Sequence, residues 1–385
     1  MKVAPSSSLE ETSTQMMTAT TVLSRRALNR ATLERQLLLR RWEMSSLHAI
    51  EHLVGLQAQT PHTWYVGLWT RLANCRADDV ANLLNERQVV RIALMRSTIH
   101  LVTGSDALAL RPLVQPVIDR SMNGNFGRHL TGLNRDALIA AGREVVDQQP
   151  RTFSELGRVL AQRWPDRDEA SLAQAIRAWV PLAQVPPRGI WGASGPAAHA
   201  SLETWLGKEL RRGYPVTEMI VRYLAAFGPA SVRDMQTWSG LTRLSEVVER
   251  LRPRVLMFRD EHGVELFDLP DAPRPDPDTP APARFLYDFD NLLLSHADRT
   301  RVITDGYHQQ NFDVHGPMPR IVLLDGFTAG TWTLATQRGT ATLMIRPFQK
   351  LSTEDADALT NEGAALLAFA TAGARVHDIQ FAHPA

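Results

Sequence analysis

The chain has 385 residues, 44% of them hydrophobic, and its 42 basic and 41 acidic side chains give a formal net charge of +1. This length allows two or three domains, and the near-zero charge gives no overall cationic excess that would indicate a polyanionic partner. The single cysteine, Cys75, excludes an intramolecular disulfide framework and a cysteine-rich zinc site. No apolar run of about 18 residues is present to span a membrane. We therefore expect a cytoplasmic protein.

The first segment combines helices with a strand pair. Residues 1–21 are rich in serine and threonine and are expected to form a disordered leader, which residues 22–130 follow as the first structural unit. Hydrophobic periodicity predicts helices over residues 28–42, 45–56 and 77–85. Two β-branched runs, 89–95 and 98–102, then predict a hairpin or wing. Ser105 is expected to cap a helix to about Arg120, which Pro112 and Pro116 kink or restart.

The second segment, residues 131–212, repeats this plan. Helices are predicted over residues 135–148, 155–164 and 169–180, with Asn134 as the cap of the first and Thr152 and Ser154 before the second. Residues 182–192 contain Pro-Pro-Arg-Gly, which is typical of the tip of a β-turn between two short strands. We expect a second wing there.

The third segment, residues 213–270, repeats the plan again. Its helices are predicted over residues 216–227, 231–238 and 244–251, and its strand pair over 255–258 and 264–267. Three helices followed by a wing is the winged-helix arrangement, a member of the helix-turn-helix class. The sequence therefore predicts three tandem winged-helix motifs in a fold that is mainly α with β.

A C-terminal subdomain is expected after the Pro/Asp-rich linker at residues 271–283. Within residues 284–385, strands are predicted over 285–294, 320–324, 331–336 and 340–345, with a tight hairpin turn at 337–339. A helix over residues 353–372 follows. We expect a small β-barrel or sheet with a terminal helix, packed on the last winged helix.

Gln57 and Gln59 flank one small residue at the end of the predicted helix over residues 45–56. An amide does not titrate in the physiological range, so such a pair can position and polarise a water but cannot take its proton outright. That restricts the reaction to substrates with a very good leaving group. The alternative is that both amides only bind turn backbone.

Six other positions carry polar or aromatic groups suited to DNA. Arg96, Thr98 and His100 alternate along a predicted strand, so their side chains should share one face beside a groove. Arg188 and Trp191 of the second wing suit phosphate contact and base stacking. Arg338 at a hairpin tip can enter a DNA groove. A core or solvent-facing histidine, a core tryptophan and a solvated turn are the respective alternatives.

Other catalytic classes lack their motifs. The chain has no Gly-x-Ser-x-Gly elbow and no glycine-rich phosphate loop, so a serine hydrolase and a nucleotide cofactor are not expected. Asp288, Asp290 and His296 have metal-ligand chemistry but no recurrent ligand spacing. A metal-dependent nuclease is therefore weighed only as a third possibility, and we expect Asp290 and Asn291 to anchor a turn. No cofactor and no metal is predicted.

Four sequence features together carry a family resemblance: Gln57-Ala58-Gln59 and the segments 96–102, 185–192 and 289–293. With three winged-helix-like repeats, the chain resembles the AlkZ-like winged-helix DNA glycosylases over nearly all residues after about Thr21. The Gln-x-Gln motif resembles the AlkZ branch, whereas the YcaQ branch has Asp at the second position. The resemblance implies that Gln57 and Gln59 are the catalytic pair and that the winged helices surround a DNA channel.

The resemblance also implies a substrate, which is double-stranded DNA carrying N7-alkylguanine, including azinomycin-type interstrand crosslinks. The expected role is DNA repair and antibiotic self-resistance in a bacterium. Alkylation at N7 makes guanine cationic, so two neutral amides suffice to hold the water. No lysine lies near the motif to form a Schiff base, so a monofunctional, metal-independent enzyme is expected. The competing hypothesis is a non-catalytic winged-helix DNA-binding regulator.

Overall fold

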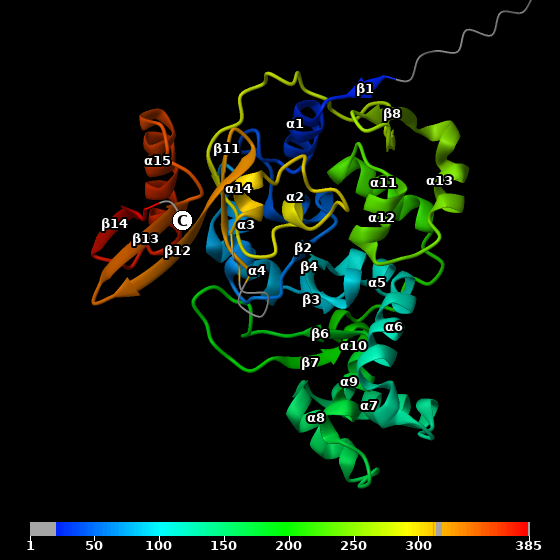
Figure 1. Ribbon diagram of the computed structural model, residues 1–385. Helices are drawn as coiled ribbons and strands as arrows, with labels where there is room; N and C mark the ends of the chain where they lie inside the picture. Colours follow the sequence, from blue (N-terminus) through cyan, green and yellow to red (C-terminus); the bar gives the residue numbers. More distant parts are fainter. Residues whose placement is uncertain (1–20, 311, 313–317, 384–385) are drawn as a thin grey trace, which may run out of the picture.

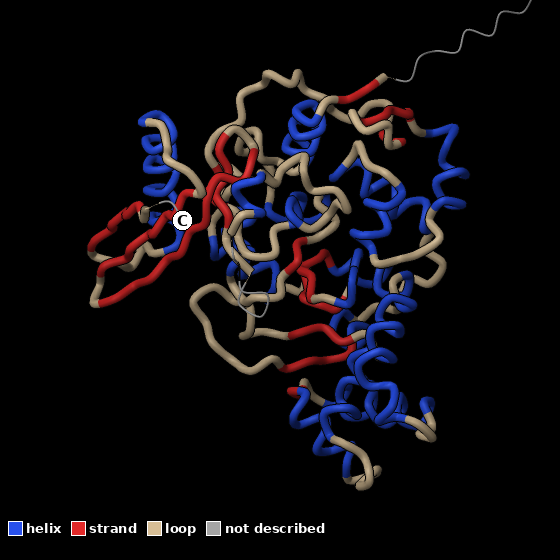
Figure 2. Tube along the Cα trace, in the orientation of Figure 1, coloured by secondary structure: helices blue, strands red, loops and turns tan. Residues whose placement is uncertain are grey.

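A computed structural model describes residues 21–310, 312 and 318–383 of the chain (Figure 1). Apart from Thr21, the predicted leader lies outside the described residues. The described part is a mixed fold of helices with one six-stranded sheet and two smaller sheets, the larger of which projects from one side (Figure 2). Among these residues, no helix is both long enough and apolar enough to cross a membrane. The prediction of a mainly α fold with β is confirmed.

The first segment differs from its prediction around the glutamine motif. Helix α1 (Arg25–Arg35) ends early, and Leu37 has a positive φ of 61°. Helix α2 (Ser46–His52) also ends early, and Gly55 turns the chain with a φ of 89°. A Cβ at Gly55 would lie 2.8 Å from the carbonyl oxygen of Leu101, so only glycine allows this approach. Gln57 consequently belongs to a strand, β2 (Leu56–Gln57), and the expected helix end is wrong.

The remaining helices of this segment follow the prediction more closely. Helix α4 (Ala77–Asn85) has the expected bounds, whereas α3 (Thr63–Trp69) was not predicted. Helix α5 (Gly104–Leu113) is capped by Thr103 instead of Ser105, and α6 (Gln115–Phe126) restarts at the prolines as expected.

One six-stranded sheet is shared by the first two segments. Its order is β2, β4 (Ile99–Thr103), β3 (Val89–Ala93), β6 (Leu182–Gln184), β7 (Ala198–Ser201) and β5 (Arg151–Thr152). The predicted second strand of the wing is therefore misplaced, because β7 begins only after a loop over residues 185–197. Because β3 pairs with β6, the hairpin of the first segment and the strands of the second belong to one continuous sheet.

The helices of the second and third segments match their predicted order, apart from α10, which was not predicted. They are α7 (Arg135–Gln148), α8 (Phe153–Ala161), α9 (Glu169–Trp179), α10 (Leu202–Leu206), α11 (Val216–Phe227), α12 (Val232–Ser239) and α13 (Ser245–Leu251). Asn134 caps α7 as predicted, because its side chain accepts from the amide of Ala137. Strands β8 (Leu256–Asp260) and β9 (Glu265–Asp268) form the third hairpin, and β1 (Val22–Leu23) pairs with β8 in parallel.

The C-terminal region is an open five-stranded sheet. Its strands follow the order β10 (Arg284–Phe285), β11 (Ile321–Leu324), β12 (Phe327–Gln337), β13 (Thr340–Pro347) and β14 (Val376–Phe381). The predicted long strand over 285–294 is wrong beyond Phe285, because Asp290 caps a 3-10 turn, η4 (Asn291–Leu293). Helix α14 (Asp305–His308) and β14 were not predicted, whereas α15 (Thr353–Ala370) was.

This sheet packs on the first segment and not on the last winged helix as expected, whereas residues 295–301 of the same C-terminal region do bond to the third segment. Phe285, Trp332 and Leu343 share one hydrophobic cluster with Leu56 and Trp64. Figure 1 shows α15 and the β12–β13 hairpin on the side where α3 lies, away from α11 to α13. The C-terminal region thereby supports the back of the glutamine motif.

Candidate active site

The backbone of the glutamine motif is held between two elements. On one side β2 pairs with β4, where Gln57 stands opposite His100. On the other side the hydroxyl of Tyr287 donates to the carbonyl oxygen of Gln57 at 3.0 Å. The amide of Asn291 donates to the carbonyl oxygen of Gly55 at 2.7 Å, and its oxygen accepts from the backbone N–H of Gln57 at 3.4 Å. The motif is therefore fixed before any substrate binds.

The side-chain oxygens of both glutamines also have protein partners. Oε1 of the buried Gln57 accepts from Nη2 of Arg96 at 2.6 Å. Oε1 of the exposed Gln59 accepts from the backbone N–H of Ile99 at 3.2 Å. Each oxygen keeps a second lone pair, and neither Nε2 has a hydrogen-bond partner among the described residues. These groups remain able to bind a water or substrate.

The buried Arg91 and the half-buried Arg96 place positive charge around the motif. Nη2 of Arg91 donates to the carbonyl oxygen of Ala58 at 2.7 Å, while its Nε and Nη1 have no partner among the described residues. Burial is the main cause that lowers the pKa of Arg91 to about 10, with the nearby charge of Arg188 as a second cause. Burial likewise lowers the pKa of Arg96 to about 10. Both guanidinium groups remain charged at neutral pH.

The expectation that Arg96, Thr98 and His100 alternate along one strand is wrong. Arg96 lies in a 3-10 turn, η1 (Met95–Ser97), with a φ of 56°, and Thr98 precedes β4. Two consecutive residues with positive φ, Arg96 and Ser97, break the strand at this point. His100 is 1% exposed, and burial, followed by the charge of Arg96, lowers its pKa to about 3. His100 is thus a neutral core histidine in the free protein.

The predicted contact residues of the second wing lie in the loop over residues 185–197. Nη1 of Arg188 donates to the carbonyl oxygen of Gly195 at 3.2 Å. Trp191 is half-buried against Tyr65 and Phe369, with ring centroids 4.9 and 5.7 Å away. It also lines a cavity of about 190 Å³ together with His62. Trp191 therefore packs against the core and still borders a cavity next to the motif.

Arg338 occupies the tip of the β12–β13 hairpin, as predicted. It is exposed and has a φ of 49°. Within the described ranges it forms no ion pair. The hairpin extends outward from the body of the molecule (Figure 1). Its guanidinium is available to an external partner.

The predicted metal-type residues have structural partners. Asp290 forms two hydrogen bonds to Arg71, at 2.7 and 2.9 Å, and both side chains are fully buried. Asp290 also accepts from the backbone N–H of Leu292 at 3.0 Å, which confirms the predicted turn anchor. Asp288 binds the hydroxyl of Thr63, and Nε2 of His296 binds the carbonyl oxygen of Phe227 at 3.0 Å. No group of three metal-binding side chains occurs in the part of the chain that the structure describes.

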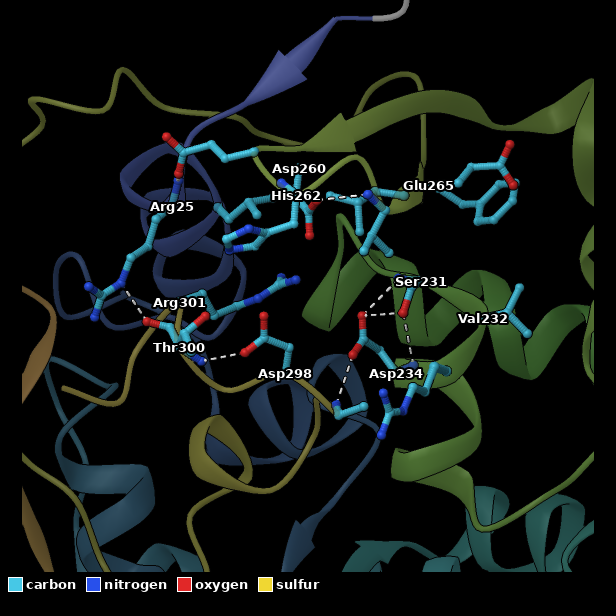
Figure 3. Close-up of a pocket in the computed structure, with 17 residues that line it drawn as sticks. Arg25, Ser231, Val232, Asp234, Asp260, His262, Glu265, Asp298, Thr300 and Arg301 are labelled. Carbon is cyan, nitrogen blue, oxygen red and sulfur yellow. Dashed lines mark hydrogen bonds between the residues drawn. The ribbon is translucent and has the colours of Figure 1, made fainter. Parts of the chain in front are cut away.

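A further cavity is separate from all these residues. It has a volume of about 780 Å³ and lies between α1, the start of α12, the β8–β9 hairpin and the segment 297–301 (Figure 3). Arg25, Asp234, His262 and Arg301 are among the residues that line it. None of the predicted site residues does so.

Three residues that hold the motif were missed by sequence reasoning. Arg91, Tyr287 and Asn291 bind the backbone of the triplet and of Gly55. Asn291 belongs to the segment 289–293, one of the features that carry the family resemblance. Its contact with Gly55, more than 230 positions away, could not be predicted from the residues next to it in sequence.

Acid sensitivity of the fold follows from the buried histidines. Burial lowers the pKa of His199 to about 4, whereas an unfolded histidine titrates near about 6.5. Between these values the unfolded state binds the extra proton, so the free energy of unfolding should fall as pH falls. His199→Gln should reduce the slope of the free energy of unfolding against pH by up to about 1.4 kcal/mol per pH unit. Urea unfolding at several pH values measures this slope. The exposed His48→Gln is the control, and an unchanged slope in His199→Gln would contradict the assignment.

The fold has a relative among solved structures that acts on DNA. The DNA glycosylase AlkZ of Streptomyces sahachiroi is similar to this chain with a TM-score of 0.76 and 20% sequence identity. The match covers 94% of this chain and 100% of that one. No curated protein matches.

The family assignment comes from a second comparison. The family model described as DNA glycosylase AlkZ-like matches residues 50–369, which include the glutamine motif and the whole six-stranded sheet. The chain therefore belongs to the AlkZ-like DNA glycosylase family.

Proposed function

We propose that the protein is a monofunctional, metal-independent glycosylase that hydrolyses the N-glycosidic bond of N7-alkylguanine in duplex DNA. The observation that carries this proposal is the fixed Gln57-Ala58-Gln59 triplet, in which both amides are oriented before substrate binds. Membership of the AlkZ-like DNA glycosylase family supports the reaction class. The proposed substrates include azinomycin-type interstrand crosslinks.

The reaction suits neutral amides. The bond from C1′ to N9 breaks with its electron pair on N9, which neutralises the cationic N7-alkylguanine as it leaves. The sugar then carries positive charge until a water oxygen bonds to C1′ and releases a proton to solvent. The second lone pairs of the two Oε1 atoms can accept from that water and orient it. No group of raised or lowered pKa is needed to activate it.

The positive charge around the motif favours binding of DNA, whose phosphates are negative, and it would repel a cationic sugar that carried no phosphates. Arg91 would oppose charge on the sugar, whereas it would attract the phosphates on either side of it. We propose that duplex binding neutralises this field before the bond breaks. The further DNA contacts proposed are Thr98, Arg188, Trp191 and Arg338.

Base release from a duplex that contains N7-methylguanine, in excess chelator, tests the reaction class. A monofunctional glycosylase releases the base and leaves an abasic site that only alkali or heat cleaves. The regulator hypothesis requires tight binding to one sequence and no base release. Strand cleavage that depends on added metal would support a nuclease instead.

Arg338→Ala should weaken binding of undamaged duplex without regard to sequence. One lost phosphate contact lowers the slope of log affinity against log salt by about 1. Arg346 is the matched control, because it is exposed on β13 at the far end of the same hairpin, where it pairs with Thr331. Equal salt slopes for the wild type and Arg338→Ala in fluorescence-anisotropy titrations would contradict the contact.

A further inference from the structure

Arg96 lies in a turn that the second and third segments hold in place. Nη2 of Arg177, on α9, donates to the carbonyl oxygen of Ser97 at 2.9 Å. Gly240, directly after α12, packs so closely that a Cβ there would lie 3.4 Å from Cα of Arg96. The position of Arg96 therefore depends on two segments other than its own.

The Arg96 guanidinium joins the glutamine motif to α12. Its Nη2 donates to Oε1 of Gln57 at 2.6 Å, and its Nη1 donates to the carbonyl oxygen of Trp238 at 2.5 Å. Trp238 is in the last turn of α12, where the helix dipole favours a cation. No carboxylate of the described residues forms an ion pair with Arg96. Its main partners are thus the catalytic candidate and the third winged-helix unit.

This contact fixes which way the Gln57 amide faces. A flipped amide would bring Nε2 against the guanidinium, so that two donors would face each other without an acceptor. Charge-assisted hydrogen bonds are also about twice as strong as neutral ones. The amide is therefore held with Oε1 toward Arg96 and Nε2 away from it.

We propose that Arg96 is a positioning residue, which locks the orientation of Gln57 and couples it to the unit formed by α11, α12, α13 and the β8–β9 hairpin. The inference rests on the proposed function, in which Gln57 orients the hydrolytic water. It replaces the sequence-based prediction that Arg96 contacts DNA directly. That earlier prediction becomes the alternative outcome of the test.

The test separates chemistry from binding. Single-turnover base release from N7-methylguanine duplex, at saturating protein, is measured for Arg96→Met, Arg96→Lys, Gln57→Ala and the combination of Arg96→Met with Gln57→Ala. The affinity for undamaged duplex and its salt dependence are measured for each. Arg120→Met is the matched control. Arg120 donates to the carbonyl oxygen of Gly240, directly after α12, at 2.6 Å, but it forms no hydrogen bond with Gln57.

Arg96→Met should slow base release by about 10- to 100-fold at unchanged affinity, as expected when a reacting group is misplaced. It should have no further effect in the Gln57→Ala background, because it acts through Gln57. Arg96→Lys keeps the charge but cannot bind both oxygens, so an intermediate rate is expected even if Arg96→Met does not fold. Arg120→Met should match the wild type.

Two outcomes overturn the inference, and they differ from failure of the proposed function. Weaker binding with a smaller salt slope at a normal single-turnover rate would make Arg96 a phosphate contact. Additive effects of Arg96→Met and Gln57→Ala would show that Arg96 acts independently of Gln57. If Gln57→Ala alone releases base at the wild-type rate, the proposed function fails first. If Gln57→Ala is slow and Arg96→Met is fast, only the positioning role is wrong.

Discussion

Gln57→Ala is expected to slow single-turnover release of N7-methylguanine by about 100-fold or more, as when one preorganised polar group is removed from an active site. Gln57 is buried and its amide is fixed by Arg96, so no neighbouring group can replace it. Gln59→Ala should have a smaller effect, because Gln59 is exposed and solvent can partly restore the lost contact. The measurement is the first-order rate of base release at excess protein, in chelator.

The matched control is Gln236→Ala. Oε1 of Gln236 accepts from the backbone N–H of Leu244 at 3.1 Å, much as Oε1 of Gln59 accepts from the backbone N–H of Ile99. Gln236 lies on α12, outside the glutamine motif. Gln236→Ala should release base at the wild-type rate. If Gln236→Ala and Gln57→Ala are equally slow, loss of rate would reflect general damage to the fold and not the motif.

Asp290→Ala should lower the free energy of unfolding by about 3–5 kcal/mol, the usual cost of breaking a buried ion pair by removing one partner. Asp290 and Arg71 have fully buried side chains, and the variant would leave the Arg71 guanidinium without its carboxylate. The turn that places Tyr287 and Asn291 against the motif would also lose its anchor. Urea unfolding followed by fluorescence measures the change.

Glu144→Ala is the matched control for this loss. Glu144 pairs with Arg163 at 2.8 Å, but both side chains are about half exposed, so its removal should cost no more than about 1 kcal/mol. Similar losses for the two variants would contradict the structural role of the buried pair. A stable Asp290→Ala protein would contradict the predicted loss of stability even if its base release were impaired, because loss of the turn anchor alone would displace Tyr287 and Asn291.

Local sequence signals predicted the helices well. Helices α4, α7 and α11 have the bounds that their apolar periodicity predicts; each has an acidic residue in its first turn, and Asn134 caps α7. The strand β2 could not be predicted, because two residues become a strand only through pairing with β4 and contact with Asn291. The positive φ of Gly55, where the chain turns from α2 into β2, was also not predictable, because it depends on the close approach of Gly55 to Leu101 on β4.

The sequence predicted which residues could belong to the site but not how they are arranged in space. The Gln-x-Gln spacing was visible in sequence, and the hairpin tip at Arg338 has the predicted place. The inward turn of Arg96 was not visible, since it requires two residues with positive φ and a partner on α12. The packing of the C-terminal sheet on the first segment likewise follows from a shared core that no local pattern encodes.

The central claim is that Gln57 and Gln59 together hold the water that releases the base. Single-turnover assay of the Gln57→Ala, Gln59→Ala double variant on N7-methylguanine duplex, with chelator present and DNA binding confirmed in parallel, tests it most directly. The account predicts normal binding and base release no faster than in the slower single variant. Base release by the double variant at the wild-type rate would contradict it.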